Sequence, residues 1–576
     1  MKKKITHWWQ NAVGYQIYPL TFKDSNNDGY GDLKGIISKL DYLKDLGVNL
    51  LWITPFFSSP MFDNGYDVSN HYSVNSLFGT NDDFKELIKE VHKRDMHIIV
   101  DFVLNHTSDE HFWFRIAQNE VNSDERNFYI FKSPKYDQNG NMIPPNNWKS
   151  FFNSSCWEYD SISQMYYLHI FDKHMPDVDW ENKLLREKYY MIAKTYLDLG
   201  VDGFRLDAIS HLAKDTEYKD SSINIDDNGL AYDTSKFSNR PKLFKFLKEF
   251  KKEVFSKYDI VTIGEVGGCF PAKDSLKFVH PRKGSLNMVF NFDTCWENGA
   301  YMAEDKKDEE IITNVVSLKN NFMRWYNAVH KKAWLPIYWL NHDHPRVVSQ
   351  YGSIKYRKES AKMLAATLLF LYGTPFIYNG EEIGMSNMKF ESLDEINEIA
   401  AKGYIEERRG KVSDDIILRN LNRSSRIHAR TVMQWSNTKN AGFTKGDTNL
   451  TVNKNYKRVN VKEQIDDPDS ILNFYKTAIK LRKDKEIEKT ILFGELQLIE
   501  QNNNDVFAYI HLDNNNPVVV ISNFRDKDVE FNVPYVFTEI LLHNYNDSQI
   551  DGNKITLRAF ESYVFKIDPK STKQRK

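Results

Sequence analysis

The sequence predicts an α/β fold: a (β/α)8 barrel with a small inserted lobe after strand 3 and a C-terminal antiparallel β domain. Eight short apolar runs, rich in Val, Ile and aromatic residues, alternate with longer amphipathic stretches. This pattern is typical of a parallel sheet that helices bury on both faces. From about residue 490 apolar residues recur at every second position instead, which indicates antiparallel strands.

The predicted barrel strands follow one another with helical segments between them. In chain order they span residues 14–19, 50–55, 97–106, 203–208, 260–266, 286–293, 337–342 and 376–382. Between them, segments such as 33–46 and 83–94 carry apolar residues at steps of three and four, as amphipathic helices do. Eight strand–helix units are the number that a closed barrel of this kind contains.

Breaks in this alternation set the predicted domain boundaries. Residues 1–105 and 173–489 are assigned to the barrel, and residues 106–172, rich in Asn, Pro, Ser and aromatic residues, to the inserted lobe. A charged, helix-like insertion occupies about 385–430.

The end of the chain forms a separate unit. Residues 490–566 contain apolar runs separated by turn residues, and we assign them to the C-terminal β domain. The tail, 567–576, is polar and basic, and we expect it to be disordered.

Composition excludes several classes of protein. The 576 residues include 77 Lys and Arg against 79 Asp and Glu, a net charge of −2, so we expect no nucleic-acid or membrane partner. Three widely spaced cysteines exclude a disulfide scaffold. The opening MKKKITHWWQN lacks the apolar core of a secretory signal, and no apolar run is long enough to span a membrane. We therefore expect a cytoplasmic protein, and a monomer.

Charged and polar side chains lie at the ends of several predicted strands, and packing of a hydrophobic core does not explain them. Because residues at the carboxyl ends of barrel strands converge, we expect these side chains to share one site. Convergent carboxylates suit general acid–base chemistry, and their separation decides between one- and two-step displacement on a sugar, which sequence alone does not give. A structural ion pair between Arg205 and Asp207 is the plainer alternative. The side chains are Asp101, Arg205, Asp207, Glu265, His342 and Asp343.

Four of these strand ends carry motifs that identify a family. DFVLNH, GFRLDA, IGEV and WLNHDHPR resemble the four sequence regions of the α-amylase family of glycoside hydrolases. The segments WWQNAVGYQIYP, DNGYDVSNHY, YLHIFDKHMPDVDWEN and NAGF extend the resemblance over about residues 8–565, toward its oligo-1,6-glucosidase and α-glucosidase members. The resemblance implies a retaining enzyme in which Asp207 is the nucleophile and Glu265 the general acid/base. Asp343 takes the place of the third carboxylate, which binds ring hydroxyls.

The resemblance also implies a pocket for one terminal glucose. Asp63 and Arg430 would meet at its floor and close it, which permits attack only at chain ends. The apolar faces of Tyr66 and Phe171 would pack on the sugar ring. The implied pocket residues are Asp63, Tyr66, His106, Phe171, Arg205, His342 and Arg430.

A metal site is suggested by the loop DSNNDGYGD. Oxygen donors at alternate positions resemble the first part of an EF-hand loop, but Gly35 stands where the twelfth-position Glu would be. A metal-free, Asx-rich turn is the alternative reading. In the family resemblance the loop holds one structural Ca2+, for which Mg2+ is a possible substitute. Its ligands would be the side chains of Asp24, Asn26, Asp28 and Asp32 and the carbonyl of Tyr30.

Three positions depart from the family pattern beside the bond to be cleaved. Ala208 stands where relatives preferring α-1,6 bonds usually have Val, so we expect an exo-acting α-glucosidase that prefers α-1,4-linked maltose and maltooligosaccharides over isomaltose. His344 and Met175 each replace a Gln near the second sugar. A histidine at this place, with Lys173 nearby in the sequence, would suit an anionic sugar phosphate, so trehalose-6-phosphate hydrolase is an alternative function. A sucrose isomerase or transglucosylase is the other alternative. A non-catalytic transporter subunit is disfavoured because all three carboxylates are present.

Overall fold

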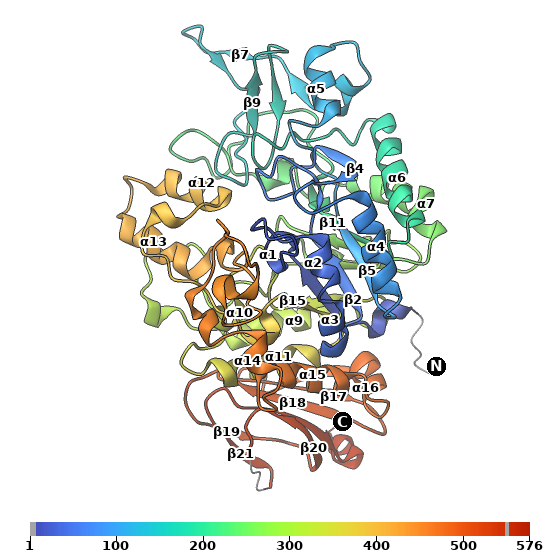
Figure 1. Ribbon diagram of the computed structural model, residues 1–576, viewed down its shortest axis with the longest axis vertical. Coiled ribbons are helices and arrows are strands. Elements are labelled where there is room, and N and C mark those ends of the chain that lie inside the picture. Colours follow the sequence, from blue (N-terminus) through green and yellow to red (C-terminus); the bar gives the residue numbers. More distant parts are fainter. Residues whose placement is uncertain (1–6, 548–551, 576) are drawn as a thin grey trace.

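The computed structural model describes residues 7–547 and 552–575, and it confirms the predicted fold class (Figure 1). Residues 1–6, on which the expectation about a signal segment partly rests, lie outside the described part of the chain. In the described ranges, no helix is long and apolar enough to cross a membrane.

Eight parallel strands form the barrel, and each overlaps one of the predicted runs. Their spatial order is β13-β12-β11-β5-β2-β1-β15-β14, and the two end strands, β13 and β14, also contact each other. Every neighbouring pair in the sheet is parallel. The strands are β1 (Gly14–Ile17), β2 (Leu50–Ile53), β5 (His97–Val103), β11 (Gly203–Asp207), β12 (Val261–Glu265), β13 (Met288–Phe290), β14 (Pro336–Tyr338) and β15 (Thr374–Tyr378).

Helices surround this sheet and bury its outer face. In α4, Thr80 and Asp83 form a capping box at the start, and apolar residues at steps of three and four face inward. The predicted helix 33–46 is instead two helices, because Lys39 leaves helical geometry and the Ser38 hydroxyl donates to the Gly35 carbonyl. The helices are α1 (Pro19–Phe22), α2 (Leu33–Ile37), α3 (Leu40–Leu46), α4 (Asn81–His92), α6 (Lys183–Asp198), α7 (Leu243–Glu253), α8 (Leu276–Val279), α9 (Val315–Val329), α10 (Val347–Gln350), α11 (Arg357–Leu369), α14 (Val461–Gln464), α15 (Ile471–Arg482) and α16 (Glu488–Phe493).

The glycine that opens β11 is required by close packing of the barrel. Gly203 has φ +145°, and a Cβ there would lie 1.9 Å from the carbonyl oxygen of Val261 on β12. Only glycine permits this approach, which aligns β11 and β12 and so the two carboxylates at their ends.

The lobe between β5 and α6 projects from the carboxyl end of the barrel (Figure 1). It carries α5 (Phe112–Asn119), a three-stranded antiparallel sheet of β6 (Phe131–Lys132), β9 (Trp157–Asp160) and β10 (Met165–Leu168), and the hairpin β7 (Lys135–Tyr136) and β8 (Met142–Ile143). A second small hairpin, β3 (Phe57–Ser58) and β4 (Asn70–Val74), follows β2.

The charged segment after β15 folds into two helices, α12 (Ile399–Arg408) and α13 (Asp414–Ser424). They share a small apolar cluster of their own, in which Tyr404 and Ile405 of α12 meet Ile417 and Leu421 of α13. The pair lies beside the lobe at the same end of the barrel (Figure 1).

The C-terminal domain is antiparallel, as its period of two predicts. A five-stranded sheet has the order β16-β17-β18-β22-β20, and β19 and β21 pair separately. Its residues alternate, so that Tyr509 and Val520 pack toward the barrel while Ile510 and Ile521 join a second cluster. The strands are β16 (Glu495–Ile499), β17 (Val506–Leu512), β18 (Val518–Asn523), β19 (Val529–Asn532), β20 (Phe537–His543), β21 (Lys554–Leu557) and β22 (Ser562–Ile567).

The tail differs from expectation. It forms a 3₁₀ helix over Pro569–Arg575, because the Ser571 amide and hydroxyl both donate to the Asp568 carbonyl and close the first turn.

Candidate active site

The three predicted carboxylates meet in one cavity of about 460 Å³ at the carboxyl ends of the barrel strands. Asp207 ends β11, Glu265 ends β12, and Asp343 follows β14. The cavity is also lined by the predicted residues Asp63, Tyr66, His106, Phe171, Met175, Ala208 and His342. Arg205, Arg430 and His344 are buried behind its surface instead.

A single guanidinium lies between the first two carboxylates. Arg205 is 1% exposed; its Nη1 lies 2.5 Å from Oδ1 of Asp207 and 2.7 Å from Oδ1 of Asp101, and its Nη2 contacts Glu265. Asp101 in turn accepts hydrogen bonds from the Tyr66 hydroxyl and the Trp52 indole, at 3.0 and 3.2 Å. Burial raises the pKa of Asp207, and Arg205 opposes that rise. The ion pair of Arg205 and Asp207 therefore exists, and it lies inside the site.

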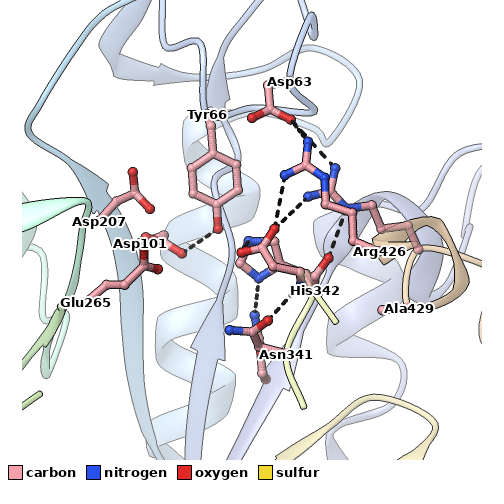
Figure 2. A network of polar contacts seen from close by, with 12 residues as sticks. Asp63, Tyr66, Asp101, Asp207, Glu265, Asn341, His342, Arg426 and Ala429 are labelled. Atoms are coloured by element: carbon pink, nitrogen blue, oxygen red, sulfur yellow. Dashed lines mark hydrogen bonds and ion pairs between the residues drawn. The ribbon is translucent and has the colours of Figure 1, made fainter. Parts of the chain in front are cut away.

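The floor of the cavity holds two arginines. Arg426 lies 2.9 Å from Asp63, 3.1 Å from Asp343 and 2.5 Å from Glu398. The expected contact of Asp63 with Arg430 is longer, at 3.7 Å, and Arg426 approaches the same carboxylate oxygen more closely. Figure 2 shows Asp63 and Arg426 on one side of Tyr66, and Asp207 with Glu265 on the other.

Asp343 is held ionised by this floor. Burial acts to raise its pKa, but the positive charges of Arg426 and Arg430 keep the pKa well below its usual range. The Arg430 Nη2 is 3.1 Å from Oδ1 of Asp343, and the Asp343 amide donates to the side chain of Asn341. The Asp343 carboxylate is thus held in one position and in its ionised form.

His106 and His342, the two histidines of the cavity that the sequence predicted, are neutral hydrogen-bonding groups; His211 lines the cavity as well. Burial lowers the pKa of His106 to about 3 and that of His342 well below its ordinary value. His342 stacks on Tyr66, with ring centroids 5.2 Å apart, and its Nδ1 is 2.8 Å from the Gln16 side-chain amide. A neutral imidazole ring can donate one hydrogen bond and accept another, so it can bind the uncharged hydroxyl groups of a sugar.

The outer part of the cavity is aromatic, which the sequence analysis did not assign. Phe292 and Trp296, from the loop after β13, and Tyr301 line it, and the Trp296 and Tyr301 rings are 4.7 Å apart. The aromatic run FNFDTCW, which begins inside the predicted strand 286–293 and continues past its end, is the signal that could have found Phe292 and Trp296. Flat apolar faces beside carboxylates are suited to neutral sugar rings.

Arg426 and Glu398 were missed as well. Both belong to the helical insertion, whose position over the barrel is a tertiary property. Glu398 is the N-cap of α12, and its side chain accepts from the amides of Ala400 and Ala401.

Two of the positions that depart from the family pattern directly follow carboxylates of the cavity, Ala208 after Asp207 and His344 after Asp343. Ala208 has left-handed backbone geometry, φ 48° and ψ 31°, directly after Asp207. His344 is buried among Phe292, Trp296 and Tyr338, with neither ring nitrogen hydrogen-bonded, and burial lowers its pKa to about 4. It carries no charge with which to bind an anion near neutral pH.

The DSNNDGYGD loop folds around its own side chains. The Asp24 carboxylate accepts from the amides of Asn26, Asn27 and Gly29, and Asp32 accepts from those of Ser25 and Gly35. In residues 7–547 and 552–575, no group of three or more His, Cys, Asp or Glu side chains is placed to hold a metal ion.

With this geometry established, comparison with known proteins defines the class. The family model for the α-amylase catalytic domain matches residues 16–490, and that for the SusG α-amylase C-terminal domain matches residues 506–564. The chain therefore belongs to the α-amylase family, and it is a glycoside hydrolase.

Full-length relatives support this assignment. The chain is similar to an oligo-1,6-glucosidase of Bacillus cereus, with 41% identity over 97% of this chain and 99% of the relative. It is 37% identical to a trehalose-6-phosphate hydrolase of Bacillus subtilis, over 98% and 99% of the two chains. Among solved structures, an isomaltulose synthase of Klebsiella has a TM-score of 0.91 at 34% identity, covering 98% of this chain and 100% of that one.

Proposed function

We propose that the protein is an exo-acting, retaining α-glucosidase that releases glucose from the non-reducing ends of short α-glucosides. One observation carries the proposal: Asp207, Glu265 and Asp343 line a single cavity, and Arg426, Arg430 and Asp63 close its floor. A closed floor leaves room for a chain end and excludes attack within a chain.

The reaction follows from the positions of the three carboxylates. Oδ1 of Asp207 is bound by Arg205, so Oδ2 attacks the anomeric carbon while Glu265 gives a proton to the leaving oxygen. Water then replaces Asp207 at that carbon while the Glu265 carboxylate removes a proton from this water, and the two displacements retain the anomeric configuration. Asp343, held by two arginines, binds ring hydroxyls and stabilises the cationic transition state.

The linkage preference is revised from the sequence expectation. The relatives do not support a preference for α-1,4 over α-1,6 bonds, since several are named oligo-1,6-glucosidase. We propose isomaltose and short isomaltooligosaccharides as the preferred substrates. The small Ala208 side chain beside the bond leaves room for maltose as a second substrate.

The wall of the cavity argues against a phosphorylated substrate. Among the described lining residues the cation is Arg426, which three carboxylates already neutralise. Neither Lys173 nor His344 lines the cavity. A sugar phosphate would thus enter without a partner for its charge.

The test combines stereochemistry with a substrate panel. Wild-type enzyme should release α-glucose first, as followed by proton NMR, and rates should rank isomaltose above maltose, with trehalose 6-phosphate and sucrose far below. Asp207→Asn should lower kcat/KM on an aryl α-glucoside by about a thousandfold or more. Release of β-glucose, or wild-type activity in the Asp207 variant, would contradict the mechanism.

We also propose that the DSNNDGYGD loop binds one Ca2+ through Asp24, Asn26, Asp28, Asp32 and the Tyr30 carbonyl. Oxygen donors of this type suit a hard cation, whose role here would be to stabilise the loop. Millimolar Ca2+ should raise the melting temperature and a chelator should lower it, with Asp28→Asn as the variant that loses the response. Equal melting temperatures with chelator, Ca2+ and Mg2+ would exclude the site.

A further inference from the structure

The inserted lobe and α12 both line the cavity. The lobe contributes Phe151, Phe152 and Asn153, and α12 contributes Ala400, Ala401 and Tyr404. The two segments are separated by more than 240 positions in the sequence. Their separation in space therefore sets how much room exists beyond the first sugar.

The lobe and α12 meet in a close packing contact and in an ion pair. Gly403 of α12 lies so close to the lobe that a Cβ there would be 3.0 Å from the Phe152 carbonyl oxygen. One helical turn beyond Tyr404, Oε1 of Glu407 lies 3.2 Å from the Nζ of Lys149. The Lys149 side chain is only 8% exposed, and Nζ also lies 3.0 Å from Asp226.

The lobe side of this contact is firmly held. The Lys149 amide donates to the Ala231 carbonyl, and Asn147 exchanges hydrogen bonds with Ser221. Lys149 and Asp226 thus belong to one hydrogen-bonded unit, formed by the lobe and the loop after β11. The contact with Glu407 joins that unit to α12.

The α12 side leads back to the reacting groups. Its N-cap, Glu398, binds Arg426, which also contacts Asp63 and Asp343. Farther along α12, the Tyr404 hydroxyl and Arg408 both contact Glu304. Of the ion pairs that the structure describes, the one that joins α12 to the lobe is Lys149–Glu407.

We propose that Lys149 is a specificity-determining, positioning residue that holds α12 against the inserted lobe and so limits the length of substrate accepted. The inference rests on the proposed α-glucosidase function and adds to it a preference for disaccharides over longer chains. Lys149 touches neither the first sugar nor the catalytic carboxylates. Its removal changes room for the outer sugars and leaves the chemical step in place.

The experiment compares two variants of the contact with a matched control. Lys149→Met removes the charge and keeps the length of the side chain, Glu407→Gln removes the other partner, and Asp226→Asn leaves the Lys149–Glu407 contact intact. For each, kcat and KM are measured on p-nitrophenyl α-glucoside, isomaltose and isomaltopentaose, with a melting curve to verify folding.

We expect the ratio of kcat/KM for isomaltopentaose to that for isomaltose to rise at least fivefold in Lys149→Met and in Glu407→Gln. The rise should come from KM on the pentasaccharide, with kcat on the aryl glucoside within twofold of wild type. The double variant should show the same ratio as either single variant, since each single variant already removes the Lys149–Glu407 contact. Asp226→Asn should change the ratio less than twofold.

An unchanged or lower ratio in folded Glu407→Gln would overturn the proposal, and so would an equal rise in Asp226→Asn. If Lys149→Met does not fold, Glu407→Gln decides alone. Failure of the proposed function has a different signature, because wild-type enzyme would then be inactive on all three substrates.

Discussion

Replacing Arg426 by Gln tests the charge network at the floor of the cavity. Arg426 is the centre of that network, since its guanidinium contacts Asp63, Asp343 and Glu398 at 2.9, 3.1 and 2.5 Å. The side chains of Asp63 and Glu398 are only 8% and 3% exposed. Removing the cation therefore leaves carboxylates that water cannot easily solvate.

The size of the expected loss of stability depends on how far Arg430 compensates for the missing charge. Removing one partner of a buried ion pair costs about 3–5 kcal/mol. Arg430 stays within 3.1–3.8 Å of all three carboxylates and compensates in part, so we expect a loss of about 3 kcal/mol. With one of its two arginines gone, Asp343 should also lose its alignment, and kcat/KM should fall by about a hundredfold, or about 2.7 kcal/mol.

Two assays and two further variants test the prediction for Arg426→Gln. Urea unfolding reports the stability, and hydrolysis of p-nitrophenyl α-glucoside reports kcat/KM. Arg324→Gln, which breaks a surface pair with Asp293, should cost less than about 1 kcal/mol. The double variant of Arg426→Gln with Glu398→Gln should lose less than the sum of the two single losses. If Arg426→Gln keeps wild-type stability and activity, the network does not support the site.

Three further predictions follow from single residues. Ala208→Val adds a branched side chain beside the bond in a left-handed backbone position, so the kcat/KM ratio of maltose to isomaltose should fall about tenfold, at about 1–2 kcal/mol of stability; an unchanged ratio would mean that residue 208 does not read the linkage. Because burial raises the pKa of Asp207, the acid limb of kcat/KM plotted against pH should have its midpoint at least about one pH unit above the ordinary aspartate pKa of about 3.9. A midpoint near 3.9 would contradict a buried Asp207. Burial raises the pKa of Glu381 to about 8, so the folded state keeps a proton that the unfolded chain releases, and stability falls as pH rises from about 4.5 to 8. Glu381→Gln should match wild type in urea unfolding at pH 5 and exceed it at pH 9, and equal stability at both pH values would refute this.

The barrel was predictable because its strands are buried on both faces. Runs such as HIIVDFV and GFRLD are apolar enough to be recognised one at a time, and their polar ends mark the site. Asp207 and Glu265 could therefore be placed together, since adjacent parallel strands end at the same edge of the sheet.

Residues whose role depends on the insertions could not be placed in this way. Arg426 lies in a charged segment that a reader of the sequence would assign to a solvated helix face, and only the packing of α12 and α13 brings it to Asp63. Glu398 carried a weak signal, an acidic residue directly before the helical pattern IAAKGYIEER. The tail was misjudged because its polar composition conceals the local hydrogen bonds around Asp568.

Trapping of the covalent intermediate tests whether Asp207 is the nucleophile. A 5-fluoro-glucosyl fluoride with the α configuration forms the glycosyl–enzyme and slows its hydrolysis, so that the labelled peptide can be sequenced by mass spectrometry. We expect one sugar per chain, attached to Asp207 in the peptide containing GFRLDA. A label on another carboxylate, or turnover that inverts configuration with no adduct, would contradict it.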